Sequence, residues 1–214
     1  LHLKKLTANA GLDISIAIIE KAREIGAHSL SGAIIDPRSL NELIPDNLEK
    51  DVPFEAEVTE EDMYYLTSKG KIRFPYLPKS MSHHGCYVAS LGQFTRWLGK
   101  ICEKEGIDIF CGFPGTELLY EDKKVIGVRT GDRGIDKNGT PKPNYDQGVD
   151  IHAKVTVLGE GPRGNLSKTL INNNDLMKGK NPQVWAIGVK ELWQMPKGSV
   201  KAGYVAHTMG FPLG

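Results

Sequence analysis

The chain has 214 residues, of which 40% are hydrophobic and 25% charged, values that exclude global disorder and a collagen-like architecture. Its 27 basic and 26 acidic residues leave a net charge of +1, so we expect no nucleic-acid partner, which would require a basic surface. Three cysteines at uneven spacing argue against a disulfide framework and favour a reducing compartment. No apolar run approaches the ~20 residues of a spanning helix, and we expect no signal peptide.

The opening residues predict the end of a helix. Leu3 and Leu6 share helical spacing, and Gly11 is a stop signal just after them. The chain also stops within an apolar segment, 204–214. We therefore interpret it as a fragment of a larger protein, although disordered or unseen ends would explain the same pattern.

The next elements predict a strand, a short helix and a hairpin. The β-branched run 14–19 predicts a strand buried on both faces, as in a parallel sheet. Residues 37–43 predict a short helix, and the acidic segment 45–62 predicts a surface excursion. Apolar segments on either side of residues 68–70 predict a β-hairpin.

The second half is more regular. Apolar residues recur at helical spacing from Leu91 to Ile101, which predicts a helix through residue 105 that Gly106 ends. The elements predicted after it are a strand at 107–110, a hairpin around 122–123, a Gly-, Pro- and Asp-rich loop at 131–148, a buried strand at 154–158, a helix at 163–171 and a strand at 184–193. This order favours an α/β fold with an inserted β-rich, α+β lobe.

Glu20 is the first candidate for binding a cofactor. An acidic residue at the carboxyl end of the second strand of a Rossmann unit hydrogen-bonds the ribose hydroxyls of a dinucleotide. It follows the glycine-rich phosphate loop by about twenty residues, so here that loop would precede Leu1. The alternative is a strand that ends in Glu without any ligand.

Two glycine-containing segments add to this interpretation. Gly159-Glu160-Gly161 stands between a predicted strand and a predicted helix, where glycines let the backbone approach a phosphate or ribityl chain. The small, polar segment 26–33 is suited to lie flat along a cofactor. The alternatives are a strand-to-helix turn without a ligand and a flexible loop.

The remaining candidates concern metals and membranes. His83-His84-Gly85-Cys86 has too few ligands for a zinc site and no second cluster nearby, and three cysteines cannot supply the four thiolates of an iron–sulfur cluster. We therefore assign no metal ligand. Residues 63–81 combine aromatic side chains with lysine and arginine, a composition suited to a membrane interface. The alternative is a hairpin packed on the rest of the protein.

Several longer segments together resemble the electron-transfer flavoprotein–ubiquinone oxidoreductase family. The segments that carry the resemblance are IEKAREIGAHSLSGAIIDPRSL, FPYLP to HHG, SLGQFTRWLG, GDRGIDKNGTPKPNYDQGVDIHAKVTVLGEGPRGNLSK, and VWAIGVKELW followed by HTMGFPL. The resemblance covers nearly the whole chain but well under half of a full-length family member.

The resemblance implies transfer of electrons from reduced electron-transfer flavoprotein to membrane ubiquinone through FAD and a [4Fe–4S] cluster whose ligands lie outside this chain. It implies a Rossmann-like FAD domain of the glutathione-reductase and hydroxylase type with an inserted ubiquinone-binding lobe. It also implies monotopic attachment to the mitochondrial inner membrane, on its matrix face, or to the cytoplasmic face of the bacterial plasma membrane. No side chain is assigned a catalytic role.

The resemblance also implies roles for individual residues. The expected cofactor-binding residues are Glu20, Lys21, Gly26, Ala27, His28, Ser29, Leu30, Ser31, Gly32, Gln93, Thr116, Glu117, Leu118, Glu160 and Gly161. The residues expected at the membrane and quinone entrance are Tyr64, Tyr65, Leu66, Phe74, Pro75, Tyr76 and Leu77.

The implied domain division has four parts. Residues 1–62 and 87–175 would belong to the FAD domain, 63–86 to the membrane-facing hairpin, and 176–214 to the start of the ubiquinone-binding domain. Because the glycine loop and the cluster cysteines are absent, we expect the chain alone to be inactive. Two alternatives stay open: a cluster-free flavoenzyme of the geranylgeranyl-reductase or hydroxylase type, and a non-enzymatic nucleotide-binding module.

Overall fold

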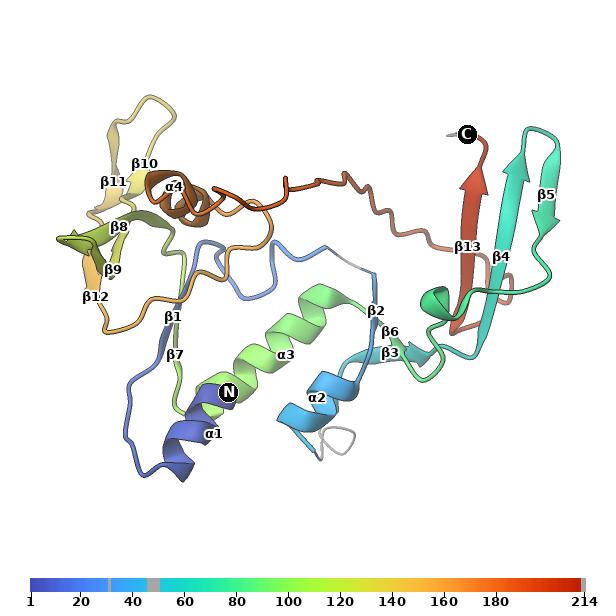
Figure 1. Ribbon diagram of the computed structural model, residues 1–214, viewed down its shortest axis with the longest axis horizontal. Coiled ribbons are helices and arrows are strands. Elements are labelled where there is room, and N and C mark those ends of the chain that lie inside the picture. The colour runs from blue at the N-terminus through green and yellow to red at the C-terminus, as the bar shows by residue number, and fades with distance from the viewer. Residues whose placement is uncertain (31, 46–50, 213–214) are drawn as a thin grey trace. The chain divides into compact units, whose positions relative to one another are not determined.

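The computed structural model describes residues 1–30, 32–45 and 51–212 and has a mixed α/β architecture with small sheets (Figure 1). The chain forms two compact units. Unit 1 consists of Leu1–Ile16, Ile25–Ile107 and Val189–Gly214, and unit 2 of Ala17–Glu24 and Asp108–Gly188. Each unit is thus assembled from segments that are far apart in the sequence.

Unit 2 contains three small sheets and one helix. Its elements are β1 (Ala17–Glu20), β7 (Asp108–Cys111), β8 (Gly115–Glu121), β9 (Lys124–Thr130), β10 (Arg133–Ile135), β11 (Pro141–Asp146), β12 (Asp150–His152) and α4 (Asn165–Asn173). Strands β1 and β7 pair in parallel, whereas β12-β9-β8 and β10-β11 are antiparallel.

The core of unit 2 lies where α4 packs on β8 and β9. Leu118, Val128 and Leu166 are buried together, and Ile19 of β1 packs against them. A Cβ on Gly115 would lie only 3.0 Å from side-chain carbons of both Val128 and Leu166, so glycine permits this close packing. The core therefore fixes the end of β1 beside β8 and α4.

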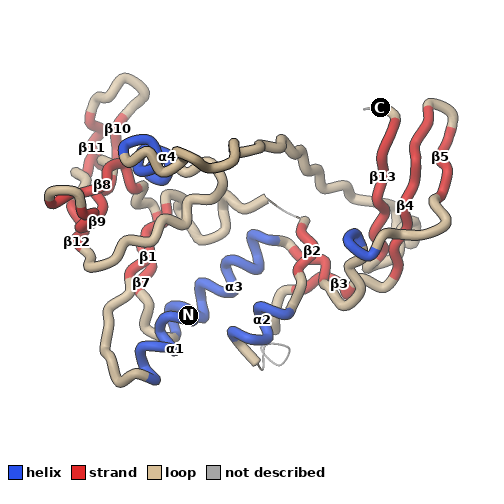
Figure 2. The backbone as a smooth tube through the Cα atoms, in the orientation of Figure 1, coloured by secondary structure: helices blue, strands red, loops and turns tan. Residues whose placement is uncertain are grey.

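Within its described residues, unit 1 contains three α-helices, a 3-10 turn and two sheets. Its elements are α1 (His2–Asn9), β2 (Ala33–Ile35), α2 (Arg38–Leu43), β3 (Phe54–Glu57), β4 (Glu60–Thr67), β5 (Gly70–Arg73), the 3-10 helix η2 (Lys79–Met81), β6 (Tyr87–Ala89), α3 (Leu91–Lys104) and β13 (Tyr204–Gly210). The first sheet has the antiparallel order β2-β6-β3. In the second, β4 pairs in parallel with β13 and antiparallel with β5, and Figure 2 shows these strands side by side.

Helix α3 is specified by local sequence and by packing. The Ser90 hydroxyl caps its first turn by accepting from the Gln93 amide at 3.5 Å. Along the helix, the Phe94 ring stacks 6.2 Å from the ring of Phe54 on β3. Gly99 leaves room for Ile25, because a Cβ there would lie 2.4 Å from the Ile25 Cδ1 atom.

Most of the predicted helices and hairpins are confirmed. The structure has helices at α1, α2, α3 and α4, the last shifted by two residues from the predicted 163–171, and hairpins at β4–β5 and β8–β9. The parallel pairing of β1 is also confirmed. Its predicted length and double burial are wrong, because β1 begins only at Ala17 and Ile18 is 40% exposed.

Four predicted segments differ from the structure. The described part of 45–62 is not a surface excursion, because it contains β3 and the start of β4 and its Val58 is only 1% exposed. The region 131–148 is not a plain loop but contains the hairpin β10–β11, whose turn is closed by Asp136 Oδ1 accepting from the amides of Asn138 and Thr140. Residues 154–158 and 184–193 form no strand, because no described strand pairs with them. Their valine side chains are accordingly exposed. The inserted lobe and the four-part domain division stay predictions.

Candidate functional site

Glu20 ends β1 as expected of a ribose-binding acid. Its main chain is opposite Cys111 in the parallel pair with β7, and its carbonyl accepts from the Phe113 amide at 3.0 Å. The side-chain Oε1 atom accepts from the Ala22 amide at 2.7 Å. This contact holds the carboxylate at the carboxyl end of the strand, next to the exposed Lys21.

Glu160 acts as a cap for α4. Its Oε1 accepts from the Leu166 amide at 3.2 Å, and its Oε2 accepts from the amide and hydroxyl of Ser167 at 2.7 and 2.8 Å. Burial raises the pKa of Glu160, but these hydrogen bonds outweigh it and hold the pKa below its ordinary 4.5. The neighbouring Gly161 has a φ of 78°, which suits glycine. The sequence pattern did not indicate the capping role.

The predicted segment Thr116–Leu118 lies on β8 against β9. Leu118 is buried in the core of unit 2. Glu117 Oε2 accepts from Arg129 Nη1 at 3.0 Å, while the Arg129 Nε and Nη2 atoms donate to Asp150 at 2.6 and 2.9 Å. The hydrogen bond with Asp150 raises the pKa of Arg129 and lowers that of Asp150. These side chains therefore tie β8, β9 and β12 together.

The other predicted cofactor residues belong to unit 1. Gly26 has a φ of 79°, and a Cβ there would lie 2.4 Å from the Gly92 carbonyl oxygen, so this segment approaches the start of α3 very closely. Ala27, His28 and Leu30 are exposed, and the Ser29 amide donates to the Gly26 carbonyl at 3.1 Å. Gln93 is exposed in the first turn of α3, Gly32 is exposed before β2, and Ser31 lies outside the described residues.

The predicted membrane hairpin consists of β4, β5 and the loop that follows. Because side chains alternate along strands, Tyr65 shares a face with its partners Ile72 and Met209. These side chains are 43%, 63% and 46% exposed, and Tyr76 in the loop is 73% exposed. Leu66, Phe74 and Leu77 are half-buried, and Pro75 is exposed.

The opposite face of this sheet is polar. The buried Asp62 accepts from the hydroxyls of Tyr64 and Tyr204 at 2.7 and 3.1 Å and from Arg73 Nε at 2.6 Å. The hydrogen bond from Tyr64, together with Arg73, lowers the pKa of Asp62, and the bonds to Tyr204 and Asp62 raise the pKa of Tyr64. The Lys71 ammonium lies 4.2 Å from the Tyr64 ring centroid. The sequence alone did not indicate this network, because Tyr204 is 142 residues from Asp62.

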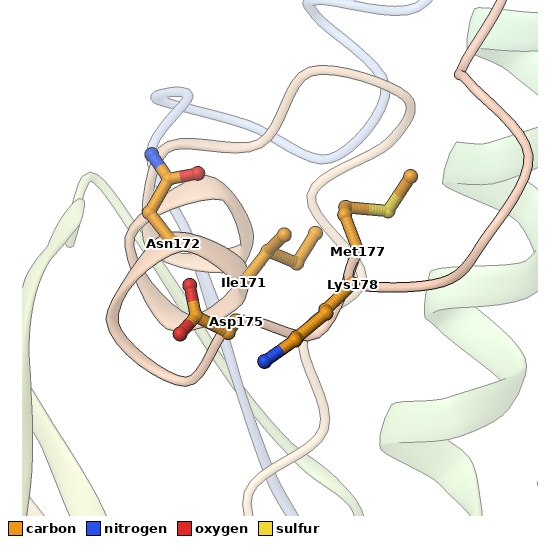
Figure 3. A pocket seen from close by; sticks show the side chains of 5 residues that line it. All are labelled: Ile171, Asn172, Asp175, Met177 and Lys178. Carbon is orange, nitrogen blue, oxygen red and sulfur yellow. The ribbon is translucent and has the colours of Figure 1, made fainter.

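The described surface includes two hollows of known lining. One, of about 280 Å³, is lined by residues of the hairpin loop and by acidic residues of β4, including Asp62, Phe74 and Tyr76. The other, of about 450 Å³, lies at the end of α4 and is lined by the five side chains that Figure 3 shows, Ile171, Asn172, Asp175, Met177 and Lys178. Only the first contains predicted site residues. Among the described residues, no helix is both long and apolar enough to cross a membrane.

No protein-family model matches the chain, but curated relatives match nearly all of it. It is 44% identical over 214 residues to the mitochondrial electron transfer flavoprotein-ubiquinone oxidoreductase of Bos taurus, covering 99% of this chain and 35% of that protein. The protein of the same name from Dictyostelium discoideum is 39% identical, covering 100% and 35%. The probable enzyme of this name from Acinetobacter baylyi is 44% identical over 205 residues, covering 94% and 36%.

Solved structures show weaker similarity. A geranylgeranyl bacteriochlorophyll reductase-like protein from Thermoplasma acidophilum is 19% identical with a TM-score of 0.43, covering 71% of this chain and 34% of that chain. The 2,6-dihydroxypyridine-3-hydroxylase of Arthrobacter nicotinovorans is 15% identical with a TM-score of 0.33, covering 69% and 31%. The sequence relatives are the stronger finding. By sequence, the chain is similar over nearly its whole length to proteins named electron transfer flavoprotein-ubiquinone oxidoreductase, and it spans about 35% of the length of the curated relatives it matches.

Proposed function

We propose that this chain is part of an FAD enzyme that passes electrons from electron-transfer flavoprotein to ubiquinone. The observation that carries the proposal is the 39–44% identity, over the whole chain, to relatives from animals and an amoeba that bear this name. The bacterial relative, also 44% identical, supports it.

The residues at the end of β1 fit the ribose of FAD. A carboxylate has about four lone-pair positions, and Glu20 uses one of them for the Ala22 amide. The remaining acceptor capacity suits two vicinal hydroxyls. In open α/β sheets, ligands bind beyond the carboxyl ends of parallel strands, where Glu20 stands. When bound, FAD would supply the redox centre, while Glu20 would orient its adenosine half.

The segment from Gly26 to Gly32 would contribute backbone instead of side chains. The close approach of Gly26 to Gly92 keeps this part of the segment flat against the start of α3. Exposed small residues such as Ala27 leave the main chain accessible to a flat ligand. In unit 2, Gly161 would offer the same backbone freedom, whereas the N-terminus of α4 beside it is already occupied by the Glu160 carboxylate.

The hairpin β4–β5 would dip into the surface of the mitochondrial inner membrane or the bacterial plasma membrane. Its exposed apolar face, which includes Tyr65 and Ile72, would enter the interface beside the quinone. Lys69 and Lys71 are exposed on the same hairpin and would meet anionic lipid headgroups. This chemistry is that of a monotopic protein.

The three cysteines do not fit a [4Fe–4S] cluster, which takes four thiolates. Cys86 and Cys102 belong to unit 1 and Cys111 to unit 2, and all three are free thiols. Burial raises the pKa of Cys86 and Cys102, which opposes thiolate formation. We therefore place no cluster on these residues and route no electron step through them.

The test uses the full-length protein extracted in mild detergent. We expect a flavin absorption spectrum and reduction of a short-chain ubiquinone analogue on addition of reduced electron-transfer flavoprotein. A colourless protein, or a flavoprotein that leaves the quinone oxidised, would contradict the proposal.

A variant tests the role of Glu20 separately. Glu20→Ala is expected to weaken FAD binding roughly ten- to a hundredfold, the value of hydrogen bonds to a charged group. Glu121→Ala, at an exposed strand end in the same unit, is the matched control and should bind FAD normally. Equal FAD affinity in the two variants would remove Glu20 from the site.

A further inference from the structure

Three side chains suited to bind a metal meet on one face of the β13-β4-β5 sheet. Glu61 is on β4, His207 is on β13, and His83 lies in the turn that precedes β6. The Glu61 Oε1 atom lies 2.8 Å from His83 Nδ1 and 3.5 Å from His207 Nε2. All three potential ligand atoms lie within 4.8 Å of one another.

The Glu61 carboxylate is fixed so that one oxygen is available. Its Oε2 accepts from the His83 amide at 2.8 Å and from the Ser82 hydroxyl at 3.2 Å. Its Oε1 faces the two imidazoles. Hydrogen bonds to the non-coordinating oxygen are the usual support of a carboxylate that binds a metal through one atom. The Glu61 side chain is only 2% exposed, so this orientation is held inside the structure.

The two histidine rings are stacked, and one ring nitrogen of His207 lacks a hydrogen-bond partner among the described residues. The His83 and His207 rings are stacked with centroids 5.4 Å apart and an interplanar angle of 17°. The His207 Nε2 atom is buried and makes no hydrogen bond within the described part of the chain; its 3.5 Å separation from Glu61 is long for one. A buried polar atom without a partner is costly, and a metal ion would satisfy it.

We propose that Glu61, His83 and His207 bind a zinc ion. Two imidazoles and one carboxylate form an established zinc-binding set, in which a water molecule takes the fourth position. At zinc–ligand distances of about 2.0–2.2 Å, tetrahedral ligand atoms lie roughly 3.3 Å apart, so small side-chain shifts would close the site. Zinc would replace the proton between Glu61 and His83, and that proton would leave to solvent.

The proposed ion would join three segments that are remote in sequence. His83 is 22 residues from Glu61, and His207 is a further 124 residues along the chain. Zinc would thus cross-link β4, β13 and the turn before β6 within unit 1. This role is independent of FAD, quinone and electron transfer, so the site and the proposed function stand or fall separately.

The experiment measures zinc binding by the full-length protein. After chelator treatment and equilibrium dialysis against zinc sulfate, bound zinc is measured by mass spectrometry. We expect the wild type to bind one more equivalent than His83→Asn, whose zinc affinity at this site should fall at least tenfold. Asparagine keeps the backbone amide that supports Glu61. His84→Asn is the matched control, because His84 is the exposed neighbour, and it should bind zinc as the wild type does.

A second variant and a spectroscopic readout identify the ligands. His207→Gln should lose the same equivalent of zinc. Circular dichroism shows whether each variant is folded, and one folded variant is enough for the test. Zinc K-edge absorption should show two imidazoles only when both histidines are intact. Equal zinc content in wild type and the folded variants would overturn the proposal, as would equal loss in His84→Asn.

Discussion

The Glu160 carboxylate links the turn after residue 158 to the first turn of α4, because it accepts hydrogen bonds from Leu166 and Ser167. The charge also faces the positive end of the helix dipole. We expect Glu160→Gln to destabilise the protein by about 1 kcal/mol, as for the loss of other helix caps. Urea unfolding measures this difference. Glu121→Gln removes an exposed charge in the same unit and should change stability far less.

The same residue predicts a pH dependence. Because the folded-state pKa of Glu160 lies below its ordinary 4.5, its ionised form stabilises the fold above that pH. This contribution is lost as the pH falls from 4.5 through the lower folded-state pKa. The stability difference between the wild type and Glu160→Gln should therefore shrink across that window. A difference that grows on acidification would assign the effect to another group.

Two features of Gly26 disfavour a side chain: its positive φ and its close contact with Gly92. Mutations can separate the two effects. Its φ is 79°, and an added Cβ would lie 2.4 Å from the Gly92 oxygen, a backbone atom that cannot move aside alone. We expect Gly26→Ala to cost more than about 2 kcal/mol of unfolding free energy. Gly11 has a φ of 66°, but an added Cβ there would have no neighbouring atom within 4 Å, so Gly11→Ala should cost only about 1 kcal/mol. Equal denaturation midpoints would show that the contact with Gly92 is unimportant.

At the scale of elements, the two faces of the β13-β4-β5 sheet differ in chemistry around the β4–β5 hairpin. Asp62, Tyr64 and Arg73 form a polar network on one face, and Tyr65 and Ile72 are exposed on the other. The alternation that produces this division is local to the sequence, but the third strand comes from residues 204–210. The hairpin was therefore predictable, whereas the sheet it belongs to was not.

This division predicts how the hairpin would contribute to the proposed membrane binding. The double variant Tyr65→Ser with Ile72→Ser should weaken binding to anionic vesicles at least tenfold, because each buried apolar side chain contributes about 1.5–3 kcal/mol. Co-sedimentation of the full-length protein measures the effect. Tyr120→Ser, which removes a 40% exposed ring from unit 2, is the control. Unchanged co-sedimentation of the double variant would place the membrane contact elsewhere.

Elements with strong local signals were predictable, and those that depend on distant partners were not. Helix α3 has a serine cap and a long apolar period, so its boundaries follow from the sequence. The hairpin β10–β11 has an exposed, polar second strand, so its residues resemble a loop. Residues 154–158 have the composition of a buried strand, but strand pairing needs a partner that composition does not supply.

The candidate sites also divide into those that depend on local sequence and those that depend on distant segments. The position of Glu20 at the end of β1 was predictable because it depends on one strand, whereas the Glu61–His83–His207 cluster needs three remote segments. The adjacent histidines His83 and His84 were the local sign of this cluster in the sequence. The sequence did not indicate which of the two faces the Glu61 carboxylate.

At the scale of the whole molecule, the cysteines are distributed over both units as half-buried free thiols. Replacing Cys86, Cys102 and Cys111 together by serine should therefore leave the iron content of the full-length protein unchanged. The reason is that three thiols, two of them with raised pKa values, are too few for a four-thiolate ligand set. Iron analysis and electron paramagnetic resonance of the reduced protein measure the iron content. Thiol titration of the denatured wild type is expected to find all three cysteines reactive. Loss of the signal of the proposed cluster in a folded variant would instead make at least one of these thiols an iron ligand.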